Sequence, residues 1–199
     1  MFLSDLLKVL NKAFMNKKSL AVVRQMFAQT VFTHKVQECA CERNEKKQAI
    51  FDWTSIVCAS LTIISIVLDS ILLGLSYLKY IGIALTVFEL IVLIVETNFQ
   101  YGKKANEHKN SAKKFLQLRN DYLHLIADIM SDKEGVDIRK NELTNRYSEL
   151  CDLSPQTEDS DYTCAQVKLG TRGEKGEEHY TWKEEEIDMF LPKELKSNK

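Results

Sequence analysis

The stretch that decides the fold is residues 53–96, WTSIVCASLTIISIVLDSILLGLSYLKYIGIALTVFELIVLIVE. Residues 53–73 form one apolar run and residues 80–95 form a second, which its flanks lengthen. An α-helix rises about 1.5 Å per residue, so each run crosses or nearly crosses a hydrocarbon core of ~30 Å. The segment Gly74–Tyr80 provides the reversal between them. We therefore expect an all-α protein organised on a two-transmembrane helical hairpin, with helices at about 53–73 and 80–98.

The two apolar runs lie between highly charged arms. This division predicts N-terminal cytoplasmic helices in residues 1–49, a transmembrane hairpin in residues 50–98 and a cytoplasmic helical region in residues 99–199. The net charge of −1 points to no class of partner. Five cysteines are an odd number without the spacing of a disulfide framework, so we expect reduced, cytosolic arms.

The orientation in the membrane follows from the basic residues near the ends of the apolar runs. Such residues are enriched on the cytoplasmic side. The turn offers only Lys79, whereas several basic residues flank the hairpin at its other end. We therefore expect an inner-membrane protein with both termini in the cytoplasm and the turn outside. The flanking residues are Arg43, Lys46, Lys47, Lys103, Lys104, Lys109, Lys113 and Lys114.

The charged arms show helical periodicity. Residues 1–15 form an amphipathic pattern that either lies in the membrane interface or packs on a cytoplasmic bundle. The periodicity of residues 19–49 predicts a second helix, with Ser19 as its N-cap. Further helices are expected at about 136–151, 159–169 and 182–191.

Residues 99–130 give the clearest helix outside the membrane. They carry a heptad-like seam, which predicts packing against the 19–49 helix as a stalk or self-association with another copy. The seam residues are Ala105, His108, Ala112, Phe115, Arg119, Tyr122, Ile126 and Ile129.

Polar residues recur at helical spacing inside both apolar runs. In the first run, Ser55, Cys58, Thr62, Ser65 and Asp69 are spaced three, four, three and four residues apart. In the second, Gly82, Thr86, Glu89 and Glu96 are expected to share a face. A turn centred near residues 76–77 would place Glu89 opposite Ser65. A carboxylate in the middle of a bilayer costs at least ~2.5–3.5 kcal/mol on insertion scales, so it should face protein or water.

Two interpretations of these stripes remain open. In the first, several hairpins assemble with the stripes inward and form a water-accessible path that favours cations or relays protons. In the second, Glu89 hydrogen-bonds to Ser65 or Thr62 and only joins the two helices. Glu96 also fits a simple marker of the cytoplasmic helix end. The candidate pore-lining residues are Glu89, Asp69, Ser65, Thr62, Thr86, Cys58 and Glu96.

The chain lacks the sequence motifs of common enzymes. It has no Walker loop, GxGxxG, HExxH or GxSxG motif. His34, Glu38 and Cys41 share a helical face, but Cys39-x-Cys41 is poor spacing for a zinc site on a helix. We therefore expect no enzyme activity, no catalytic residues, and no metal or cofactor. The basic run after the hairpin is explained by topology and anionic lipid, so direct nucleic-acid binding is not expected.

The order of these parts resembles a known family. The shared features are a charged N-terminal helix, Trp53 opening the first membrane helix, a close hairpin and the basic helix from Tyr101 to Tyr122. These features resemble the SLATT family of two-transmembrane effectors, over roughly residues 15–170. The segment Arg146–Leu150, Ser154-Pro155 and Asp161-Tyr162 are similar to the fifth SLATT subfamily.

The resemblance implies a function but no catalytic residues. It implies a membrane-perturbing or pore-forming effector of a bacterial defence system, acting on the lipid bilayer as a homo-oligomer. Its partner would be a sensor of infection, either a nucleotidyltransferase or a reverse transcriptase. The alternative is a membrane-anchored scaffold that recruits a cytoplasmic partner through its helical arms.

Overall fold

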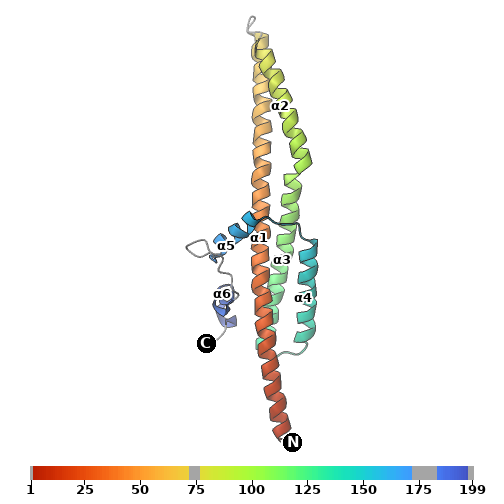
Figure 1. Cartoon of the computed structure of the whole chain (residues 1–199), viewed down its shortest axis with the longest axis vertical. Coiled ribbons are helices and arrows are strands. Elements are labelled where there is room, and N and C mark those ends of the chain that lie inside the picture. Colours follow the sequence, from red (N-terminus) through yellow and green to blue (C-terminus); the bar gives the residue numbers. More distant parts are fainter. Residues whose placement is uncertain (1, 72–76, 172–182, 197–199) are drawn as a thin grey trace. The chain divides into compact units, whose positions relative to one another are not determined.

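The computed structural model describes residues 2–71, 77–171 and 183–196, with side chains from residue 17 onward. All regular structure in these residues is helical, so the predicted all-α class is confirmed (Figure 1). The elements are α1 (Phe2–Ile71), α2 (Tyr77–Phe99), α3 (Tyr101–Met130), α4 (Val136–Leu153), α5 (Asp159–Leu169), α6 (Glu184–Met189) and a short 3-10 turn, η1 (Lys193–Leu195).

Helix α1 is one uninterrupted helix of 70 residues. The prediction that a second helix starts at Ser19 was therefore wrong. The physical reason is that no glycine or proline precedes Gly74, so nothing in the backbone ends the helix that begins at Phe2. The predicted amphipathic face of residues 1–15 concerns side chains outside the described set.

Helices α2 and α3 are separated at one residue. Gln100 has a positive φ of 49°, which ends α2 and lets α3 begin at Tyr101. The next interruption, after Met130, contains Asp132 with φ 53° and Gly135 with φ 77°. Left-handed backbone of this kind stops a helix, and glycine adopts it at little cost. The helix break expected around residues 131–135 is thus confirmed.

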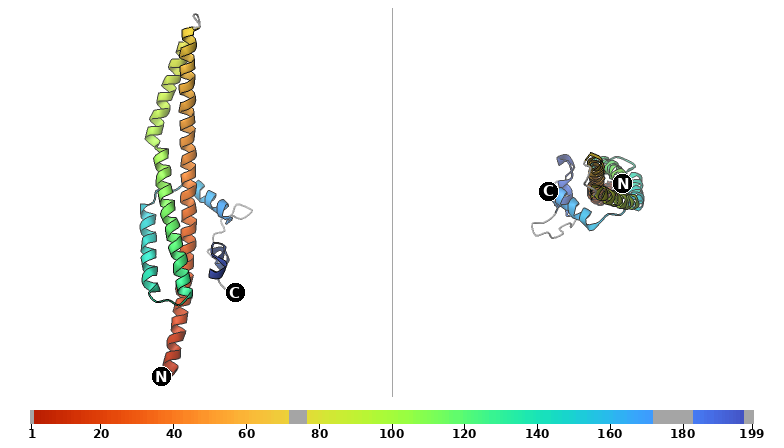
Figure 2. Two further views of the ribbon diagram at one scale, coloured as in Figure 1. Left: turned by 180° about the vertical axis from the view of Figure 1, so that it is seen from behind. Right: turned by 90° about the horizontal axis from the view of Figure 1, so that it is seen from above.

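The chain forms two compact units, residues 1–40 with 107–199 and residues 41–106. In the first unit, α4 lies on one side of α1, whereas α5 and α6 lie on the other (Figure 2). Its core combines Val23 and Phe27 of α1 with Phe115, Tyr122 and Ile126 of α3. The predicted packing of the α3 seam against the 19–49 segment is therefore confirmed for this unit.

The C-terminal helices are attached to the same core. Ile187 and Leu191 are buried in it, and Asp188 forms an ion pair with Arg24, whose side chain is buried. Helix α5 starts with a cap in which the Glu158 backbone N–H donates to Asp161 Oδ2 at 2.9 Å. The first unit is therefore a helical bundle, and α6 with the residues that follow it packs against its core.

Candidate functional site in the helical hairpin

The second unit contains the hairpin of α1 and α2, and two polar stripes meet in it. On α1, the buried and half-buried positions include Ser55, Cys58, Thr62, Ser65 and Asp69. On α2, they include Gly82, Leu85, Glu89, Val92 and Glu96. Both sets are spaced three, four, three and four residues apart, which is the spacing of two helices packed along a common seam. We call these ten residues the hairpin seam.

Ser65 and Gly82 mark a close approach of the two helices. Ser65 Oγ donates a hydrogen bond of 2.6 Å to the backbone carbonyl oxygen of Leu78. A Cβ atom added to Gly82 would lie 3.3 Å from the same Oγ. A side chain larger than a methyl group at this position would therefore push the helices apart.

These contacts correct the predicted register of the hairpin. Ser65 lies opposite Leu78 and Gly82, not opposite Glu89. Counting seven residues back from Ser65 and seven forward from Leu78 and Gly82, we expect Cys58 at the level of Leu85 and Glu89. The shift arises because α1 ends at Ile71 and α2 begins at Tyr77, both earlier in the chain than the expected ends at residues 73 and 80.

Glu89 is the charged residue in the middle of the hairpin seam. It is half-buried, and among the described residues its carboxylate has no hydrogen bond or ion pair. On α1, Ser55 Oγ is buried, also without a hydrogen-bond partner in the described part of the chain. The Thr62 hydroxyl donates to the backbone oxygen of Cys58 at 2.9 Å. The polar groups of the seam therefore keep unused hydrogen-bonding capacity.

Thr86 does not lie on the hairpin seam. Leu85 occupies the half-buried position between Gly82 and Glu89, whereas Thr86 is exposed. The Thr86 hydroxyl donates to the backbone oxygen of Gly82, 2.9 Å away in its own helix. Thr86 and Glu89 are three residues apart and so lie on one helical face, as expected, but Thr86 lies at its exposed edge.

Glu96 is held at the end of the seam away from the turn by a residue that the sequence patterns did not single out. Gln48 Nε2 donates to Glu96 Oε1 at 2.6 Å and to Asp52 Oδ1 at 2.9 Å. Gln48 Oε1 accepts from the backbone N–H of Gly102 at 3.0 Å. One amide thus joins α1, α2 and the start of α3. Only its position, one helical turn before the apolar run, could have drawn attention to it.

Aromatic and basic side chains gather at this same end. The Phe51 and Tyr101 rings stack with centroids 5.6 Å apart, and Phe99 stacks on Tyr101 at 5.5 Å. Lys47 Nζ and Lys104 Nζ lie 5.4 and 5.8 Å from the centre of the Tyr101 ring. Aromatic rings with nearby lysines are typical of a membrane–water interface.

The outer surface of the hairpin is apolar. Both helices are long and apolar enough to cross a membrane, and only 11% of the most apolar window of each is buried. The core helix of a soluble protein would be mostly buried. Large exposed side chains cover the surface instead, among them Trp53, Ile63, Ile64, Ile83, Phe88, Leu90 and Ile94.

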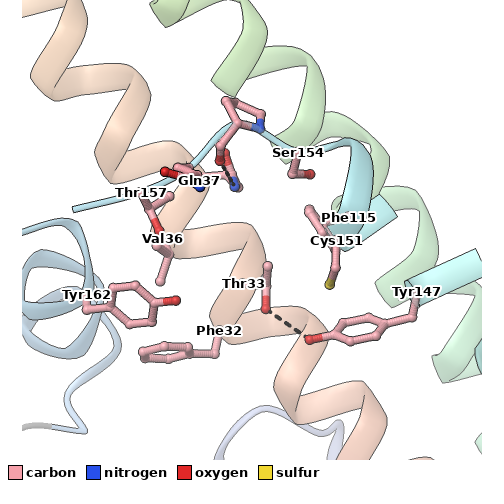
Figure 3. A pocket seen from close by; sticks show the side chains of 12 residues that line it. Phe32, Thr33, Val36, Gln37, Phe115, Tyr147, Cys151, Ser154, Thr157 and Tyr162 are labelled. Atoms are coloured by element: carbon pink, nitrogen blue, oxygen red, sulfur yellow. Dashed lines mark hydrogen bonds between the residues drawn. The ribbon is translucent and has the colours of Figure 1, made fainter. Parts of the chain in front are cut away.

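The first unit contains a separate pocket of about 420 Å³ (Figure 3). Phe32, Val36 and Tyr162 lie on one side, and Tyr147 and Cys151 lie on the other. Its twelve lining residues are all uncharged. Burial raises the pKa of the Cys151 thiol, so this thiol has little thiolate character at neutral pH.

The walls of this pocket are held by hydrogen bonds. The hydroxyls of Thr33 and Tyr147 lie 3.3 Å apart. Gln37 Nε2 donates to the backbone oxygen of Pro155 at 3.3 Å, and Gln37 Oε1 lies 2.7 Å from Nδ1 of the buried His108. These hydrogen bonds therefore fix residues that line the pocket. His108 of the predicted α3 seam does so indirectly, because it holds the side chain of Gln37.

The predicted helix-face residues near His34 do not form a metal site. His34 Nε2 lies 3.5 Å from Glu38 Oε1. In the described ranges, no three histidine, cysteine, aspartate or glutamate side chains are grouped closely enough to hold a metal ion.

A polar seam inside an apolar helical hairpin defines a two-transmembrane helical membrane protein. Residues 20–186 match the model of SMODS and SLOG-associating 2TM effector domain family 4, and the chain belongs to this family. The resemblance to the SLATT family is thus confirmed, although the matching model is that of family 4 and not of the fifth subfamily. No curated protein and no solved structure matches the chain.

Proposed function

We propose that this chain is an effector of a bacterial anti-phage or conflict system that permeabilises the inner membrane. It acts as a homo-oligomer and causes growth arrest or cell death when a nucleotide-sensing or reverse-transcriptase partner triggers it. Its hairpin spans the bilayer with both arms in the cytoplasm. The observation that supports this proposal best is Glu89, a half-buried carboxylate without a described partner in a hairpin whose outer surface is apolar.

The composition of the hairpin seam supports an exchange in which α2 leaves the α1 of its own hairpin and packs against a neighbouring copy. Four of its five α1 positions are serine, threonine or cysteine, and its α2 side contains Gly82. Small residues let a helix of a neighbouring copy approach as closely as the helix of the same hairpin, and membrane helices gain only about 0.6 kcal/mol from an average polar contact. In an oligomer, α2 can therefore pack against a neighbouring hairpin and turn the polar seam toward a shared lumen.

Glu89 gives such a lumen its chemical character. A ring of carboxylates at one level of a pore favours cations. Inside a single hairpin the same carboxylate carries a cost on the order of 2.5–3.5 kcal/mol. Contact with water in the oligomer removes part of that cost, so this residue favours the open assembly over the separate hairpin.

The test is the membrane potential of cells that express the chain together with its trigger. We expect the wild-type chain to depolarise the cells and Glu89→Gln to do so much less at equal membrane abundance. Ser60→Ala is the matched control, because the exposed Ser60 hydroxyl donates to the backbone oxygen of Ile56 in its own helix. A triggered wild-type chain that leaves the potential unchanged, or equal depolarisation by Glu89→Gln, contradicts the proposal.

The second candidate function is a membrane-anchored scaffold. It is favoured by the uncharged pocket in the first unit, which offers the arms a concave surface for a partner. Replacing residues 50–98 with an unrelated transmembrane hairpin separates the two functions. Growth arrest retained by this chimera supports the scaffold, and growth arrest lost at equal membrane abundance supports permeabilisation.

A further inference from the structure

A hollow of about 380 Å³ lies between α1 and α2 near the turn of the hairpin. Most of its wall is apolar, but one carboxylate and one ammonium group line it. Its lining residues are Ile66, Asp69, Ser70, Lys79, Gly82, Ile83, Thr86 and Val87. The hydroxyls of Ser70 and Thr86 each donate to a backbone oxygen of their own helix. The donor protons of both hydroxyls are therefore used, and the two charged groups are the strongest polar partners that the hollow offers a ligand.

Asp69 and Lys79 line the same hollow without pairing with each other. Asp69 is half-buried and Lys79 is exposed. In the described ranges neither has an ion pair, although Lys79 Nζ lies 5.1 Å from the centre of the Tyr80 ring. Residues 72–76, which connect the two helices, have the sequence LLGLS and contain no charged side chain. Both charges are therefore open to an external partner within the described ranges.

In a hairpin that spans the bilayer, the residues beside the hollow place it at the depth of lipid headgroups. Tyr77 and Tyr80 are exposed at the start of α2, and tyrosine is enriched at membrane–water interfaces. Asp69 is two residues from the end of α1 at Ile71. The apolar side chains of Ile66, Ile83 and Val87 continue from this level toward the middle of the hairpin. A ligand that fills the hollow needs a charged head above an apolar chain.

We propose that this hollow binds one phospholipid with a primary ammonium headgroup, of the phosphatidylethanolamine class. Lys79 binds the phosphate, Asp69 accepts hydrogen bonds from the ammonium group, and an acyl chain lies along Ile66, Ile83 and Val87. Phosphatidylcholine has no N–H donor for the carboxylate, and phosphatidylglycerol has no cation. This site goes beyond the proposed function, because lipid binding at the turn does not require a pore.

The experiment is native mass spectrometry of the full chain, released from detergent containing equal amounts of 1-palmitoyl-2-oleoyl phosphatidylethanolamine, phosphatidylcholine and phosphatidylglycerol. We expect the ethanolamine lipid to be retained preferentially, by about tenfold, as the loss of one charge-assisted hydrogen bond implies for the others. Asp69→Asn should abolish the preference over phosphatidylcholine. Lys79→Gln should lower the retention of all three lipids.

Three further variants keep the proposal open to refutation. Val87→Trp fills the hollow from an exposed position and should remove the bound lipid. Leu90→Trp, exposed on the same helix outside the hollow, should not. Asp52→Asn removes a carboxylate at the far end of the hairpin seam and should leave the lipid preference unchanged.

Each contrary result has a definite meaning. Equal retention of the three lipids shows an unselective annular contact, and the proposal fails. A preference for the ethanolamine lipid that persists in Asp69→Asn places the ammonium group elsewhere, and the proposal fails. A lipid-free dimer in the wild type that Val87→Trp dissociates shows that a second copy covers the hollow. Any of these results leaves the depolarisation test of the proposed function unaffected.

Discussion

The substitution Gly82→Leu tests the close approach of α1 and α2. Its Cβ would lie 3.3 Å from Ser65 Oγ and 3.8 Å from Ile66 Cγ1, so the following side-chain atoms have no room without separating the helices. Separation breaks the 2.6 Å hydrogen bond from Ser65 to Leu78, which is worth about 1 kcal/mol. Overpacking adds about 1–3 kcal/mol, and the higher helix propensity of leucine returns roughly 1 kcal/mol. The net loss of hairpin stability is about 1–3 kcal/mol.

The assay is the free energy of separating α1 and α2, measured by steric trapping of the full chain in lipid nanodiscs. Ile83→Leu is the matched control, since Ile83 is an exposed neighbour and should change the free energy by less than about 0.5 kcal/mol. Gly82→Ala should be nearly neutral, because its propensity gain offsets the tight contact with Ser65. Equal stability of Gly82→Leu and the wild type would show that the helices do not meet at this residue.

Three other predictions concern the core, the seam end and pH. Phe27→Ala should destabilise the first unit by about 3–5 kcal/mol in chemical denaturation, whereas the exposed Val22→Ala should have little effect. Gln48→Leu should speed hydrogen exchange of the Gly102 amide, whose acceptor it removes, and unchanged exchange would refute this role. Burial lowers the pKa of His34, so the unfolded chain binds the proton more readily. Stability should therefore fall as the pH drops below about 6.5, and His34→Gln should flatten this dependence in thermal melts from pH 5 to 8.

Apart from the wrong start at Ser19, the sequence predicts the helices well because each has a local signal. The apolar runs at 53–73 and 80–95 show the hairpin, and Gly135 and Gly170 follow the helical periodicity at positions with positive φ. The α3 seam was predictable for the same reason, since one face of a long helix must be covered.

The register of the hairpin was not predictable from the same information. Residues 71–75 read ILLGL, so apolar character continues through the reversal and does not reveal where either helix ends. A shift of two or three residues in the centre of the reversal moves the facing position on the other helix by about twice that amount. The Ser65 contacts with Leu78 and Gly82 depend on that shift.

The contacts of Gln48 and the walls of the pocket could not be predicted from the sequence for a different reason. Gln48 forms hydrogen bonds with Glu96 and Gly102, which lie 48 and 54 positions later in the sequence. The Thr33 hydroxyl contacts that of Tyr147, which lies 114 positions later. A polar residue on a helix looks the same in sequence whether it faces water or a distant partner. Only the packing of the helices decides which of these applies.

The meeting of the two polar faces is tested most directly by disulfide formation from the native Cys58. The other four cysteines are changed to alanine, and single cysteines are introduced by Leu85→Cys, Glu89→Cys or Glu96→Cys. Cross-linking requires Cα atoms about 4.4–6.8 Å apart. We expect mild oxidation in membranes to join Cys58 to position 85 or 89 rapidly and to position 96 slowly. Preferred cross-linking to position 96, or equal slow reaction at all three positions, would contradict the hairpin seam.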